Sequence, residues 1–125
     1  MNREDFKLKS RFNSFRYAFN GLRSLIRNEH NARIHLMALL GVIILGIILK
    51  ISFPEWCLLS IVIGLVFVAE LFNTALETLS DIVEHEWNDK IKNVKDYAAA
   101  AVLVSAIVSV IVGGLIFIPR LLDLF

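Results

Sequence analysis

Three long apolar segments constrain this chain more than any other feature of its sequence. They cover residues 34–51, 56–80 and 97–118. A helix needs about 20 residues to cross the hydrocarbon core of a bilayer, and backbone polar groups inside lipid must be satisfied within the helix. The chain is 57% hydrophobic, above the roughly 45–50% of soluble domains, so we predict an all-α membrane protein with three transmembrane helices.

The charges in the two connections indicate how these segments are oriented. The second connection and the start of the third segment carry Lys90, Lys92 and Lys95, whereas Lys50 lies at the first connection. Lysine and arginine accumulate in cytoplasmic loops. We therefore expect the N-terminus and the second connection to lie in the cytoplasm.

Residues 12–28, ahead of the first apolar segment, have the pattern of an amphipathic helix. Apolar residues recur there at spacings of three and four: Phe12, Phe15, Phe19, Leu22 and Ile26. We expect this helix to lie in the membrane interface, although a helix packed on protein would show the same pattern. Residues 1–33 hold eight Lys or Arg, which suits an anionic lipid surface. Few basic residues remain elsewhere, so we expect no nucleic-acid partner.

A polar stripe follows the second apolar segment and consists of Glu70, Asn73, Glu77 and Asp81. At about 100° per residue, the three acids fall within roughly 20° of one line on a helix. Inserting an acid at the membrane centre costs about 2.5–3.5 kcal/mol. We therefore expect an interaction at this stripe that offsets the cost. A bound cation would offset both the free-energy cost of burying these acids and the repulsion between them. The alternative is that these polar residues only hold neighbouring helices together.

Two further sites are candidates to bind a phosphate donor beside this stripe. Glu29 precedes the first apolar segment, at the same expected depth as Glu77. Mg²⁺ commonly takes one or two carboxylates plus phosphate oxygens, which this pair would provide. Lys95 and Asp96 open the third segment, where a lysine could contact phosphate. No Walker or glycine-rich nucleotide loop is present in the sequence, so a nucleotide would be held differently.

Two stretches of the sequence resemble a known family. "AELFNTALETLSD", followed by "KDYAAAAVL", resembles the signature of the small integral-membrane diacylglycerol kinases of bacteria, a family that includes the undecaprenol kinases. "GLRSLIRNEHNARIH" resembles the N-terminal segment of that family. The similarity extends over roughly residues 10 to 118.

The resemblance implies a homotrimer in the bacterial inner or plasma membrane, each chain (residues 1–125) being one domain. Active sites would form between subunits at the cytoplasmic interface. The reaction would transfer the γ-phosphate of ATP to undecaprenol or diacylglycerol. Glu70 would be the general base, and Glu29 and Glu77 would bind Mg²⁺ with ATP. The other implied cofactor-binding residues are Tyr17, Asn73, Glu86, Trp87, Asn88, Lys95 and Asp96.

Two positions depart from the diacylglycerol-specific Gram-negative members, which have Glu where this chain has His35 and His where it has Asn88. The run "NARIH" looks more like the undecaprenol kinase branch and favours a polyprenol acceptor. The alternative function is a small proton-coupled transporter or channel subunit that relays ions along Glu70 and Glu77. Lys95 argues against it, because a proton relay has no use for a phosphate-binding lysine there.

Overall fold

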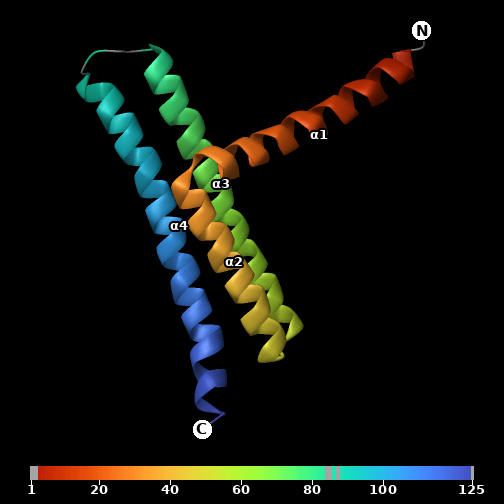
Figure 1. Cartoon of the computed structure of the whole chain (residues 1–125), viewed down its shortest axis with the longest axis vertical. Coiled ribbons are helices and arrows are strands. Elements are labelled where there is room, and N and C mark those ends of the chain that lie inside the picture. The colour runs from red at the N-terminus through yellow and green to blue at the C-terminus, as the bar shows by residue number, and fades with distance from the viewer. Residues whose placement is uncertain (1–2, 84–85, 87, 125) are drawn as a thin grey trace.

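Four helices make up the part of the chain that the computed structural model describes, which is residues 3–83, 86 and 88–124, with side chains from residue 11 onward. They are α1 (Arg3–Asn28), α2 (His30–Ile48), α3 (Phe53–Val83) and α4 (Asp89–Leu122). Helices α3 and α4 pack against each other over much of their length, α2 runs beside α3, and α1 projects away from these three (Figure 1). The predicted all-α fold class is confirmed.

Three of these helices, α2, α3 and α4, are long and apolar enough to cross a membrane, judged over the described residues. Helix α3 has 31 residues and α4 has 34, which correspond to about 46 and 51 Å. The hydrocarbon core of a bilayer is only about 30 Å thick. The two helices therefore extend beyond it, and the polar residues near the end of α3 and the start of α4 need not lie deep in lipid.

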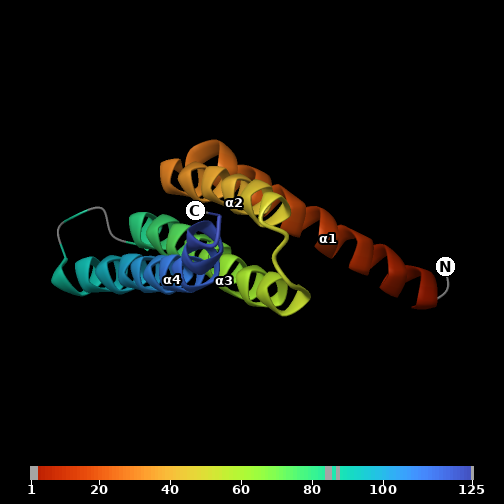
Figure 2. The same ribbon diagram turned by 90° about the horizontal axis from the view of Figure 1, so that it is seen from below.

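A sharp bend at Glu29 separates α1 from α2. Glu29 has an extended backbone (φ −96°, ψ 124°), and α2 begins directly after it. The Arg33 side chain donates hydrogen bonds from Nε to the Ile26 carbonyl (3.1 Å) and from Nη2 to the Arg27 carbonyl (2.6 Å). These bonds satisfy carbonyl groups at the C-terminal end of α1 and hold the bend. Figure 2 shows α1 leaving the three apolar helices from this bend.

The opposite end of the structure contains a small apolar core, where the end of α4 meets the start of α3. Its buried residues are Ile51, Leu59, Ile116 and Phe117. Gly46 of α2 contributes by having no side chain, because a Cβ atom there would lie 2.7 Å from the Trp56 ring. This close approach lets α2 pack on the start of α3.

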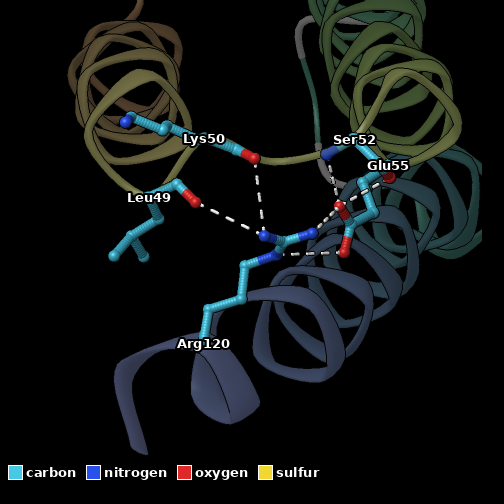
Figure 3. A network of polar contacts seen from close by, with 5 residues as sticks. All are labelled: Leu49, Lys50, Ser52, Glu55 and Arg120. Atoms are coloured by element: carbon cyan, nitrogen blue, oxygen red, sulfur yellow. Dashed lines mark hydrogen bonds and ion pairs between the residues drawn. The ribbon is translucent and has the colours of Figure 1, made fainter. Parts of the chain in front are cut away.

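A polar network joins three segments next to this core (Figure 3). Arg120 of α4 donates to both carboxylate oxygens of Glu55, at 3.2 and 2.5 Å, and to the carbonyls of Leu49 and Lys50, each at 3.4 Å. Glu55 also accepts from the Ser52 backbone N–H and hydroxyl, at 2.6 and 2.7 Å. Lys50 turns the chain with a positive φ of 49°. We call these five residues the Arg120 network.

Replacing Arg120 with Met is expected to lower the thermal unfolding temperature of the protein in detergent by several degrees. The variant removes the guanidinium hydrogen bonds that connect α4 with the α2–α3 turn, and it leaves Glu55 without its cation. Differential scanning fluorimetry or circular dichroism would measure the shift.

Lys92→Met is the matched control for this experiment. Lys92 pairs with Asp96 one turn away on the surface of α4, and exposed pairs of this kind contribute little to stability. Equal unfolding temperatures for Arg120→Met and the wild-type protein would show that the Arg120 network does not hold the helices together.

Candidate active site

Glu70 is the most unusual residue of α3, because its carboxylate is almost fully buried. It is 2% exposed. Its Oε1 lies 3.2 Å from Nε2 of His35 on α2. That oxygen nevertheless makes no hydrogen bond to any described residue. A buried carboxylate without full hydrogen bonding is costly, so Glu70 is a strong candidate for a functional group.

Two other acids predicted for the site lie in the same neighbourhood. Glu29, at the bend before α2, and Glu77, two turns along α3, are near enough to Glu70 for their charges to repel its carboxylate. Both side chains are half-buried. The contacts of α1 and α2 with α3 therefore gather three acids, separated by up to 48 positions in sequence, at one place.

Asn73 links this group along α3. Its Nδ2 donates a hydrogen bond to Oε1 of Glu77, at 3.0 Å, one helical turn away. The Asn73 amide oxygen and the Thr74 hydroxyl are buried and have no hydrogen-bond partner among the described residues. Unpaired oxygen atoms next to a carboxylate are the kind of donor that a hard cation prefers.

The donor set fits Mg²⁺ bound together with a phosphate better than an all-protein metal cage. Among the residues that the structure describes, no group of three or more His, Cys, Asp or Glu side chains is arranged to hold a metal ion. Mg²⁺ usually keeps only one or two protein carboxylates and takes its other oxygens from phosphates and water. Glu29 and Glu77 would supply two such carboxylates.

Lys95 and Asp96, at the start of α4, each form an ion pair. Lys95 Nζ pairs with Asp81 Oδ1 on α3, and Lys92 Nζ pairs with Asp96 Oδ2 on α4. The first pair connects α4 with α3. It places the Lys95 ammonium group beside Asp81, which lies one helical turn beyond Glu77. Asp81 therefore has a partner on α4 that its position in the polar stripe did not reveal.

The site is therefore layered along α3. Glu70 comes first, then the hydrogen-bonded pair of Asn73 and Glu77, then Asp81 with Lys95. At 1.5 Å per residue, Glu70 and Asp81 are roughly 16 Å apart along the helix axis. Figure 1 shows this part of α3 extending from the level of the α1–α2 bend toward the connection with α4.

The remaining predicted residues are not gathered with Glu70 within one chain. Tyr17 is 70% exposed on α1, the helix that leads away from the other three. Glu86 is exposed, and Asn88 is the N-cap of α4, where its side chain accepts a hydrogen bond from the Lys90 N–H at 3.0 Å. Trp87 lies outside the described residues.

An apolar cavity of about 270 Å³ lies among α2, α3 and α4. His35 belongs to its wall, together with side chains that are almost all apolar: Ile34, Ala38, Leu39, Val42, Ile63, Val66, Phe67, Ala106, Ser109 and Val110. His35 therefore lies between the Glu70 carboxylate and a space that suits a hydrocarbon group.

Sequence reasoning did not find the contacts that His35 and Asp81 make. Each contact joins residues on different helices, so it depends on how those helices are rotated about their axes. A histidine at the start of an apolar segment was the only available signal for the first contact. For the second, the signal was a lysine that follows the polar stripe after one connection.

The fold and the site together define a helical membrane protein with an acidic, oxygen-rich site at one end of its apolar helices. The model of the family described as prokaryotic diacylglycerol kinase matches residues 16–117. The chain therefore belongs to the prokaryotic diacylglycerol kinase family, as the resemblance of its motifs predicted.

Three relatives show how the similarity is distributed. An undecaprenol kinase of Bacillus subtilis is 39% identical over 110 residues, which cover 88% of this chain and 89% of the relative. A diacylglycerol kinase of Synechocystis sp. is also 39% identical, over 112 residues that cover 89% of this chain and 64% of the relative. A diacylglycerol kinase of Escherichia coli is 32% identical over 95 residues, or 76% of this chain and 78% of the relative.

Proposed function

We propose that this protein is an ATP- and Mg²⁺-dependent lipid kinase that transfers the γ-phosphate of ATP to the hydroxyl of a membrane lipid. The observation that carries the proposal is Glu70, a buried carboxylate whose Oε1 has no hydrogen-bond partner among the described residues. A lipid hydroxyl that reached this carboxylate could donate its proton to it. Membership in the prokaryotic diacylglycerol kinase family supports the same reaction class.

Glu70 would act as the general base. As the acceptor oxygen forms its bond to the γ-phosphorus, the hydroxyl proton moves to the Glu70 carboxylate, and the bond from phosphorus to the β–γ bridging oxygen breaks to leave ADP. Phosphoryl transfer depends mainly on positioning and charge neutralisation, and a fixed base contributes to both. The burial of Glu70 keeps bulk water away from the carboxylate and so disfavours hydrolysis of ATP.

Glu29 and Glu77 would hold Mg²⁺ with the phosphates of ATP. The metal would neutralise the negative charge that develops on the transferred phosphoryl group. Asn73 donates to Glu77 and so fixes the orientation of one carboxylate. Lys95 would leave its ion pair with Asp81 when the nucleotide binds and would then contact the phosphates of ATP. Asp96 would lie beside it.

The rest of the nucleotide site would be completed by a neighbouring subunit in a homotrimer. Only 11 to 22% of the apolar windows of α2, α3 and α4 is buried within one chain, so large apolar faces remain for partners or lipid. Tyr17 lies on α1, which projects away from the other helices (Figure 1). In a trimer it would lie over another chain, and Glu86, Trp87 and Asn88 would line the same nucleotide.

Undecaprenol is the favoured acceptor, with diacylglycerol as the second candidate. The Bacillus subtilis relative named as an undecaprenol kinase matches this chain over 89% of its own length. The apolar cavity next to His35 is also compatible with the first isoprene units of a polyprenol. The protein would act in the bacterial inner or plasma membrane, with its N-terminus and the α3–α4 connection on the cytoplasmic side.

A proton-coupled transporter or channel subunit is the weaker alternative. It would need Glu70 and Glu77 to exchange protons along α3. The half-buried Glu77 instead accepts a hydrogen bond from Asn73. One turn further along α3, Asp81 forms an ion pair with Lys95. These contacts favour a site that binds a phosphorylated ligand.

A competition between two acceptors tests the proposal. Purified protein in mixed micelles would receive γ-labelled ATP, Mg²⁺ and equal amounts of undecaprenol and diacylglycerol. We expect the label in undecaprenyl phosphate to exceed that in phosphatidic acid at early times. Label in phosphatidic acid alone would reverse the choice of acceptor. Absence of label from both lipids would contradict the kinase assignment.

A further inference from the structure

His35 lies against the Glu70 carboxylate. Its Nε2 lies 3.2 Å from Glu70 Oε1, and the two side chains are 21% and 3% exposed. The contact is close but is not aligned as a full hydrogen bond, since the same oxygen has no hydrogen-bond partner among the described residues. Hydrogen bonds in active sites are often long or poorly aligned before the substrate binds and become shorter afterwards.

The surrounding charges explain why Glu70 needs such a neighbour. Glu29 and Glu77, when ionised, disfavour a charge on the Glu70 carboxylate, whereas the His35 ring can offer it an N–H donor. Without a donor nearby, the carboxylate would have little reason to keep one orientation inside the helices. His35 comes from α2 and Glu70 from α3, so their contact also fixes how these two helices meet at the site.

The location of His35 adds a second observation. Its side chain forms part of the wall of the apolar cavity among α2, α3 and α4. A hydroxyl group carried by a hydrocarbon chain in that cavity would arrive beside the His35 ring, whose Nε2 lies 3.2 Å from Glu70 Oε1. A residue in this place affects the encounter between the acceptor and the base.

We propose that His35 is the positioning residue of Glu70: its Nε2–H donates to Glu70 Oε1 and aims the carboxylate at the hydroxyl of the acceptor lipid. This inference rests on the proposed kinase function. His35 takes no part in bond making or breaking. The hydroxyl proton still passes to Glu70, and His35 holds the carboxylate in the orientation that accepts it.

The test compares two substitutions of similar size at this position. His35→Gln keeps an N–H donor that can reach Glu70, whereas His35→Leu keeps the bulk and removes the donor. We expect His35→Leu to lower kcat for lipid phosphorylation by about 10- to 100-fold, the range for a lost hydrogen bond to a charged group, with KM for Mg·ATP changed less than about 2-fold. His35→Gln should retain most of the wild-type kcat.

The outcomes separate this inference from the proposed function. If the wild-type protein phosphorylates lipid and His35→Leu matches it, the inference is wrong while the kinase function stands. Equal losses in His35→Leu and His35→Gln would also overturn it, because the donor would then not be what matters. A raised KM for Mg·ATP or loss of the oligomer in His35→Leu would assign His35 a structural role instead. No turnover by the wild-type protein would refute the proposed function itself.

Discussion

Glu70→Gln is expected to lower kcat for lipid phosphorylation by about 10²- to 10⁴-fold, the usual contribution of a general base. Glutamine has nearly the shape of glutamate and fits the same buried place, but it cannot accept the hydroxyl proton. Because the substitution removes a charge from an apolar environment and relieves repulsion from Glu29 and Glu77, the protein should remain folded. Steady-state kinetics, with an unfolding temperature measured in parallel, would check both statements.

Glu70→Asp serves as the graded control for that result. Aspartate keeps a carboxylate but sets it back by one methylene group, so we expect a kcat between those of the wild-type protein and Glu70→Gln. Mg·ATP binding should be nearly the same in all three proteins. If Glu70→Gln retained wild-type turnover, Glu70 would not be the base.

Glu77→Gln should instead act on the nucleotide. We expect KM for Mg·ATP to rise by at least about 10-fold, because losing a ligand should cost no less than losing the residue that supports a ligand. The Asn73 amide can still hydrogen-bond to the new side chain, so the local packing should survive. Raising the concentration of free Mg²⁺ should recover part of the loss. Kinetics at several fixed Mg²⁺ concentrations would measure both effects.

Asp123→Asn is the matched control for Glu77→Gln. Asp123 is an exposed carboxylate at the C-terminal end of α4, far along the helix from Lys95, and it loses the same charge in this variant. We expect its KM for Mg·ATP to be that of the wild-type protein. An equal rise in both variants would attribute the effect to net charge and not to a metal site.

The apolar segments and the polar stripe were readable from the sequence because each depends on a single helix. The angle between Glu70 and Glu77 follows from helical geometry alone. The helices of the structure extend past the apolar segments, with α3 covering Phe53–Val83, because polar residues outside the hydrocarbon continue the helix. Pro54 is compatible with this start, since proline is tolerated in the first turn.

The contacts between helices could not be read in the same way. His35 and Glu70 are 35 positions apart, and Arg120 reaches Glu55 across 65 positions. Which side chains meet at such distances depends on the crossing and rotation of α2, α3 and α4, and apolar periodicity gives little information about rotation when a helix is apolar on most of its faces. The motif resemblance named the acids of the site together with Asn73 and Lys95, but not the contacts that His35 and Asp81 make between helices.

The proposed phosphoryl transfer from ATP to a lipid at the acidic face of α3 is the property on which the other activity predictions depend. Its most direct test is to incubate the wild-type protein and Glu70→Gln side by side with γ-labelled ATP, Mg²⁺ and undecaprenol, and to measure label in the extracted lipid and ATP bound to protein. We expect labelled lipid from the wild-type protein, almost none from Glu70→Gln, and similar ATP binding by both. Equal labelling by the two proteins, or none from either despite bound ATP, would contradict it.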